Sequence, residues 1–108
     1  MNKLTRKEIL KVIESSRYSV IHIDADWDNY RFEVNEKLNG LKAKYIGKVS
    51  FAYIDCDQEQ EYAKEIQLRN TPSIAYYEGA ELKAVVLGVN QDINSNIELL
   101  TKSMPIDQ

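Results

Sequence analysis

The sequence predicts an α/β fold, in which helices cover both faces of a mixed β-sheet. Short β-branched segments alternate with amphipathic segments along most of the chain, which is typical of parallel strands joined by helices. The last two strand-like segments are separated only by Glu78-Gly79-Ala80, which predicts an antiparallel hairpin. A chain of 108 residues has room for one hydrophobic core, so residues 1–108 are expected to form a single domain.

Four segments have the periodicity of amphipathic helices: about 6–16, 29–46, 59–68 and 93–102. Thr5 and Glu8 have the spacing of a capping box at the start of the first helix. Asp28 is expected to cap the second helix, where its carboxylate can accept first-turn N–H groups. Asp92 or Asn94 is expected to cap the last helix.

Four further segments are rich in β-branched and aromatic residues and are expected to be strands: 18–24, 49–55, 73–78 and 82–87. A short edge strand at 2–4 would make the sheet five-stranded. The first two strands are joined through a long helix and are therefore expected to be parallel. The tail from Ser103 is expected to be frayed.

Composition and charge exclude several classes of protein. Fourteen Lys and Arg stand against seventeen Asp and Glu, a net charge of −3, and a compact nucleic-acid-binding domain usually has a basic excess. The one cysteine, Cys56, cannot form an internal disulfide or a multi-cysteine zinc site, and it fits a reducing compartment. Neither a signal-peptide apolar region nor an 18-residue apolar stretch is found. We therefore expect a cytoplasmic protein without nucleic-acid or membrane partners.

Three stretches of the sequence resemble the thioredoxin family. Residues 20–27, Val-Ile-His-Ile-Asp-Ala-Asp-Trp, resemble the strand that leads into the family's Trp-Cys-Gly-Pro-Cys site. Residues 47–58 resemble its central strand, and residues 66–73 resemble the segment that holds its cis-proline. The likeness covers about residues 5–102 and implies a thioredoxin-like fold, a central mixed sheet of four or five strands flanked by four helices.

The resemblance does not extend to the family's redox chemistry. Where the family has Cys-Gly-Pro-Cys, this sequence has Asp28-Asn29-Tyr30-Arg31. Disulfide exchange needs one thiolate to attack and a second thiol to resolve the mixed disulfide, so we expect no dithiol oxidoreductase activity and no cofactor. His22 stands where the family has a buried acid, and we expect it to be a core histidine with satisfied hydrogen bonds.

The resemblance also implies a groove for a protein partner, because the matching family residues border a cleft in which an extended client peptide pairs beside the cis-proline. These residues are Trp27, Tyr30, Thr71, Pro72 and Gly88. The first functional hypothesis is therefore a redox-inactive adaptor or chaperone-like module that binds another protein. No apolar stripe beyond the needs of the core is apparent, so we expect a monomer or a weak homodimer.

Two alternatives remain open. Cys56 alone could serve as a redox sensor or thiol enzyme, although the neighbouring acids are expected to raise its pKa. Four acids at the ends of two neighbouring strands could instead hold Mg²⁺ or Ca²⁺ through oxygen ligands; they are Asp24, Asp26, Asp55 and Asp57. Arg31 is expected to pair with Asp28 or the nearby acids, or to face a partner.

Overall fold

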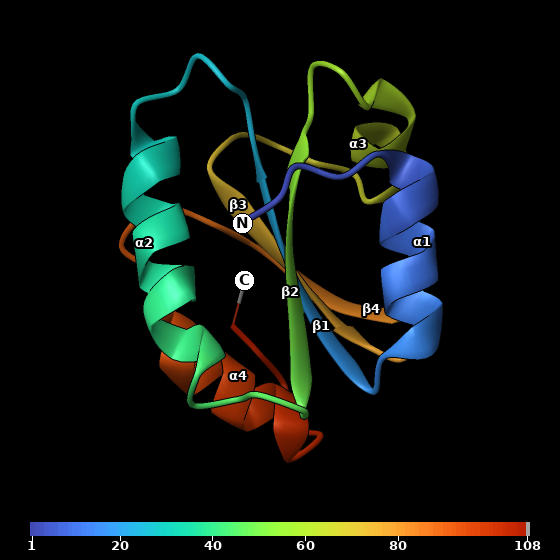
Figure 1. Ribbon diagram of the computed structural model, residues 1–108, viewed down its shortest axis with the longest axis vertical. Helices are drawn as coiled ribbons and strands as arrows, with labels where there is room; N and C mark the ends of the chain where they lie inside the picture. The colour runs from blue at the N-terminus through green and yellow to red at the C-terminus, as the bar shows by residue number, and fades with distance from the viewer. Residues whose placement is uncertain (108) are drawn as a thin grey trace.

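The computed structural model describes residues 1–107, and it has the predicted order of helices and strands (Figure 1). The elements are α1 (Arg6–Ser15), β1 (Tyr18–Asp24), α2 (Tyr30–Lys42), β2 (Val49–Asp55), α3 (Gln60–Glu65), β3 (Ser73–Glu78), β4 (Glu81–Leu87) and α4 (Ile93–Thr101). The four strands form one mixed sheet in the order β2-β1-β3-β4. β1 pairs with β2 in parallel, and the other pairs are antiparallel, so the predicted fold class is confirmed.

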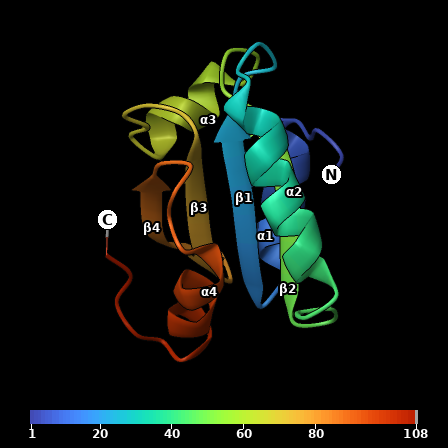
Figure 2. The same ribbon diagram turned by 90° about the vertical axis from the view of Figure 1, so that its left-hand side faces the viewer.

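Helices cover both faces of this sheet. α2 and α4 lie on one face, and α1 and α3 lie on the other (Figures 1 and 2). A hydrophobic cluster fills each face of the sheet, and β1 contributes to both because side chains alternate along a strand. Val20 packs in the cluster of α2 and α4, and Ile21 packs with Ile9 of α1. His22 has the same parity as Val20 and points towards α2, where it contacts Asn35.

The helix bounds differ from the sequence predictions where local hydrogen bonds replace helical ones. α2 begins at Tyr30 and ends at Lys42, four residues before the expected end. The buried Tyr45 explains this end, because its carbonyl accepts the N–H groups of both Lys48 and Val49 and so closes a turn. α3 ends at Glu65. Gln67 then adopts a positive φ of 54°, which is incompatible with continuing a right-handed helix.

Both ends of the chain also differ from expectation. The edge strand expected at 2–4 is reduced to one bridge, Lys3 with Tyr53, so the sheet has four strands. The tail expected to fray is anchored, because Ile106 is buried in the cluster that includes Leu100 of α4. Within residues 1–107, no helix is long and apolar enough to cross a membrane.

Candidate functional site

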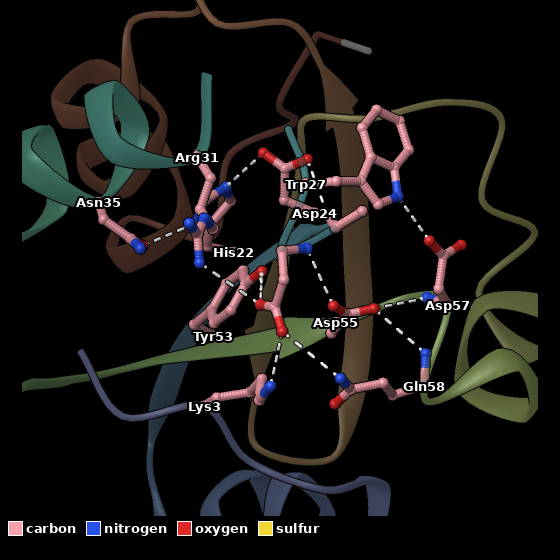
Figure 3. Close-up of polar contacts among 12 residues, drawn as sticks. Lys3, His22, Asp24, Trp27, Arg31, Asn35, Tyr53, Asp55, Asp57 and Gln58 are labelled. Carbon is pink, nitrogen blue, oxygen red and sulfur yellow. Dashed lines mark hydrogen bonds and ion pairs between the residues drawn. The ribbon is translucent and has the colours of Figure 1, made fainter. Parts of the chain in front are cut away.

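The ends of β1 and β2 meet at one edge of the sheet, as the sequence predicted. Asp24 and Asp55 are register partners in the parallel pair. The loops that follow these strands carry the remaining acids, Asp26 and Asp57. Figure 3 shows the side chains of these strand ends and loops gathered into one polar network.

Asp55 is the structural centre of this network. Its carboxylate is buried and accepts three backbone N–H groups, from Asp26 at 2.9 Å, Asp57 at 2.8 Å and Gln58 at 3.1 Å. Asp26 belongs to the loop after β1, whereas Asp57 and Gln58 belong to the loop after β2. One carboxylate therefore ties the two loops together.

Asp26 is half-buried and is surrounded by donors. Its Oδ2 accepts from Lys3 Nζ at 2.7 Å, and its Oδ1 accepts from the Tyr53 hydroxyl at 3.0 Å and lies 3.5 Å from Nη1 of Arg31. The hydrogen bond from Lys3 is the largest cause of a lowered pKa of Asp26. Burial, followed by the bond to Asp26, raises the pKa of Tyr53. Arg31, whose partner the sequence left open, thus pairs with Asp26.

The arrangement of the four strand-end acids does not support the metal site that the sequence left open as an alternative. Each carboxylate already accepts at least one hydrogen bond within the protein: Asp24 from the Ala25 N–H, Asp55 from backbone N–H groups, Asp26 from Lys3 and Tyr53, and Asp57, through Oδ2, from the Trp27 indole. Among residues 1–107, no three His, Cys, Asp or Glu side chains are grouped so that they could hold a metal ion. Neighbouring strand ends bring the acids close together without making their oxygens converge.

A second cluster of polar side chains, His22, Asp24 and Asn35, lies beneath the start of α2. His22 and Asp24 are both fully buried, with His22 Nε2 3.3 Å from Asp24 Oδ2 and His22 Nδ1 2.7 Å from Asn35 Oδ1. Both ring nitrogens of His22 therefore have a hydrogen-bond partner. His22 is thus the buried, hydrogen-bonded histidine that the sequence predicted.

Asp28 lies just before α2, at the position where the sequence resemblance places the family's first cysteine. Its Oδ1 accepts the N–H of Tyr30 at 2.9 Å, but the N-cap of α2 is Asn29, which makes no side-chain cap hydrogen bond, so the cap predicted at Asp28 lies one residue later. Burial is the largest cause of a raised pKa of Asp28, and the neighbouring Asp24 raises it further. This carboxyl group cannot form the disulfide that a cysteine would form here.

The residues expected to border a partner groove gather at the same end of the sheet. Ile23 of β1 is the register partner of Ser73, which places the loop containing Trp27 beside the Thr71–Pro72 segment. The Thr71–Pro72 bond is cis, and the Pro72 carbonyl accepts the N–H of Gly88 at 2.9 Å.

Trp27 and Tyr30 are exposed in this region. Trp27 is 74% exposed, and its Nε1 donates to Asp57 Oδ2 at 2.7 Å. Figure 3 shows the indole held over the loop after β2 by this bond. Tyr30 is 55% exposed. Large aromatic side chains that stay exposed in an ordered position are typical of binding surfaces.

Sequence reasoning missed Leu87, which is half-exposed at the end of β4 and pairs with Ser73. An open cavity of about 380 Å³ lies beside it, lined by Ser73, Leu87 and residues of β4 and the loop after α3, but not by Trp27. The available signal was the period-two alternation of β4, because Leu87 has the same parity as the charged residues Glu81 and Lys83. We call Trp27, Tyr30, Thr71, Pro72, Leu87 and Gly88 the rim.

Cys56 follows Asp55 and is half-buried. Burial is the largest cause that raises the pKa of its thiol to about 11, and Asp57 and Asp55 add to the effect. A thiol with this pKa is almost entirely protonated at neutral pH, so it is a poor nucleophile there.

The chain is similar to thioredoxins both in sequence and in structure. The thioredoxin family model matches residues 1–99. Mitochondrial thioredoxin 3 from Saccharomyces cerevisiae has a TM-score of 0.78 at 23% identity, over 96% of this chain and 95% of that chain. The thioredoxin from Plasmodium falciparum has a TM-score of 0.79 at 16% identity, over 94% and 98%. The thioredoxin from Fasciola hepatica has a TM-score of 0.76 at 24% identity, also over 94% and 98%.

Proposed function

Because the chain belongs to the thioredoxin family but carries Asp28 and Arg31 in place of the two active-site cysteines, we propose that it is a non-catalytic protein-binding module. Neither side chain can attack a disulfide or resolve a mixed one. The rim remains at this end of the sheet. Its role in this proposal is that of an adaptor or chaperone-like factor in the reducing cytoplasm, where it holds an extended segment of another protein.

The exposure of Trp27, whose indole is hydrogen-bonded to Asp57, is the observation that carries this proposal. A buried tryptophan removes up to about 250 Å² from water, so covering the 74% of Trp27 that is exposed contributes at most about 4.6 kcal/mol of favourable free energy, at about 25 cal/mol per Å². The hydrogen bond to Asp57 fixes the indole before a partner arrives. A fixed side chain loses less entropy on binding than a mobile one.

The backbone next to Pro72 can pair with a strand of a partner once one local hydrogen bond is broken. The N–H of Thr71 donates to Asn70 Oδ1 at 2.8 Å, and Asn70 is exposed. A partner strand that accepts from the Thr71 N–H must therefore displace this side chain. The exchange replaces one hydrogen bond by another at the surface and costs little.

The other two hypotheses have weaker physical support. A single-cysteine redox sensor needs a thiolate, and the raised pKa of Cys56 opposes its formation. A metal-binding domain needs free oxygen ligands, and those of the strand-end acids already accept hydrogen bonds. Partner binding at the rim requires neither.

The test is recovery of a partner from native lysate under reducing conditions. Tagged wild type would be compared with Trp27→Ala, Cys56→Ser and Met104→Ala, after circular dichroism has shown that each variant is folded. Met104 is a matched control because it is a half-exposed apolar side chain of the C-terminal tail.

We expect one stoichiometric partner with wild type, Cys56→Ser and Met104→Ala, and its loss with Trp27→Ala. Equal recovery with Trp27→Ala would refute the rim as the binding site. Loss with Cys56→Ser alone would favour the thiol hypothesis.

A further inference from the structure

The two edges of the sheet are built differently. The outer strand β4 carries Glu81 and Lys83, which form an ion pair at 3.2 Å, and its pairing with β3 is irregular at Tyr76 and Tyr77. Charged side chains and bulges at an edge strand prevent a further strand from pairing with it. The opposite edge strand, β2, has no charged residue between Val49 and Ile54. Its own sequence therefore does not protect it.

The N-terminal half of β2 has an open outer side. Leu4 covers the other half, because its N–H donates to the Tyr53 carbonyl at 2.8 Å. The backbone N–H of Val49 also faces away from β1, since it donates to the Tyr45 carbonyl. Backbone groups of alternate residues in a strand face the same side, so Phe51 directs its N–H and C=O outward too. Figure 1 shows the N-terminal segment crossing only the upper part of β2.

A groove of about 490 Å³ runs along this open half of β2. The end of α1, the chain after α2 and the start of β2 line it, with Val12, Ile46 and Phe51 among the apolar side chains. Ile46 is 83% exposed, and Phe51 is only half-buried. An open strand edge with apolar side chains beside it is the surface that strand addition uses.

The charge around this groove identifies the chemistry of its occupant. The protein is acidic overall, yet the segment 37–54 contains Lys37, Lys42, Lys44 and Lys48 and no Asp or Glu. Among the described residues that line the groove, Lys42 is the one charged side chain. Lys44 is already near Glu98, at 3.6 Å. Lys42 and Lys48 are exposed and can face carboxylates of a bound segment.

A second copy of this chain fits the groove poorly. In a two-fold symmetric pair the same surface meets itself, so pairing of two β2 edges would put both copies of Lys42 and Lys48 into one interface. Like charges across an interface are unfavourable. An acidic segment satisfies both the open backbone groups and the lysines.

We propose that the outer edge of β2 at residues 49–51 is a second docking site, where an extended acidic segment of a partner protein adds a strand to the sheet. The site lies at the start of β2, whereas the rim lies at the end of the sheet where β2 finishes. The two proposals are therefore independent, and either can fail without the other.

The test uses a blocked ten-residue peptide in which Glu alternates with Val and Thr, and a second peptide in which Lys replaces Glu. Binding is measured by fluorescence anisotropy at low and high salt, and the site is mapped by amide chemical shifts and hydrogen exchange. The test variant is Lys42→Glu with Lys48→Glu. The matched control is Lys7→Glu with Lys64→Glu, which changes the net charge equally and, like the test pair, includes a lysine in the last turn of a helix.

We expect only the acidic peptide to bind, with weaker binding at high salt and shifts concentrated at Val49–Phe51. Exchange of the Phe51 amide should slow at least about tenfold on binding. The Lys42/Lys48 double reversal should weaken binding at least about tenfold, whereas the control double reversal and Trp27→Ala should change it less than about twofold.

Four outcomes would overturn the proposal. They are no binding at millimolar peptide, equal binding of the lysine peptide, shifts centred on Thr71 and Gly88, or a dimer in sedimentation experiments that already protects the Phe51 amide.

Discussion

Replacing Asp55 by Ala tests whether one buried carboxylate holds the two loops at the candidate site. The change removes the acceptor of three backbone N–H groups, at 2.8 to 3.1 Å. A hydrogen bond to a charged group contributes about 1.5–3 kcal/mol when buried. These donors are part-buried and can be rehydrated, so we expect a total loss of about 3 kcal/mol in the free energy of unfolding. For a chain of this length that corresponds to about 13 °C in Tm.

The matched control is Asp57→Ala, two residues along the same chain. Asp57 is exposed and accepts one side-chain hydrogen bond, from Trp27 at 2.7 Å. We expect a loss of about 0.5 kcal/mol, because exposed interactions of this kind contribute little. Asp57→Ala removes the acceptor of the indole, and Asp55→Ala loosens the loop that carries this acceptor. Both variants should therefore weaken partner binding, but only Asp55→Ala should strongly destabilise the fold.

Urea unfolding followed by circular dichroism gives both free energies, and the slopes show whether the transitions remain comparable. A loss below about 1 kcal/mol for Asp55→Ala, or equal losses for the two variants, would refute the role assigned to Asp55. Asp55→Asn should lie between wild type and Asp55→Ala, because its amide keeps one oxygen acceptor but turns an NH₂ group towards the N–H donors.

Two further predictions follow from the pKa shifts. The pKa of Asp28 is raised in the folded state, chiefly by burial, so its ionisation costs stability above its unfolded pKa of about 4. Asp28→Asn keeps an oxygen for the Tyr30 N–H and should raise Tm at pH 7 but not at pH 3; calorimetry showing equal gains at both would contradict this. Cys56, with a pKa of about 11, should react with iodoacetamide at pH 7 more than about tenfold slower than in the unfolded chain. Its rate should still rise above pH 9, and a plateau below that pH would show that the thiol is more acidic.

The sheet was the most predictable part of the protein. Strands β1, β2 and β3 have the predicted bounds, because a buried strand needs an uninterrupted β-branched or aromatic segment. The capping box of Thr5 and Glu8 is also formed, since it depends on local spacing alone. The end of α2 was predicted wrongly because Tyr45 can both continue the apolar periodicity and close a turn through its carbonyl.

The roles of the acids could not be predicted from the sequence. Asp24, Asp26, Asp55 and Asp57 are the same residue type at equivalent strand ends, and the pattern predicted only that they lie close together. Which oxygen faces which donor depends on loop conformation, and that depends on Asp55 itself. The partner of Arg31 was equally undetermined, because several carboxylates were within reach in sequence terms.

The positions that carry the thiols in the family differ from those that we propose to hold a partner. The first are side chains at the start of α2, and replacing them by Asp28 and Arg31 removes the thiols. The second are held by other interactions: Trp27 by Asp57, and Gly88 by the Pro72 carbonyl. The bonds that hold Trp27 and Gly88 involve neither position 28 nor position 31, whereas Tyr30 of the rim does depend on position 28, because its N–H donates to Asp28 Oδ1.

The two proposed docking surfaces can be occupied at the same time. β2 has seven residues, and a rise of about 3.3 Å per residue places its ends about 20 Å apart. A segment at the rim and a strand added at residues 49–51 therefore do not compete for the same atoms. An adaptor holds two partners at once, so the proposed site on β2 would supply the second docking surface that the proposed role requires. If both sites bind, the sheet itself is the rigid connection between the two partners.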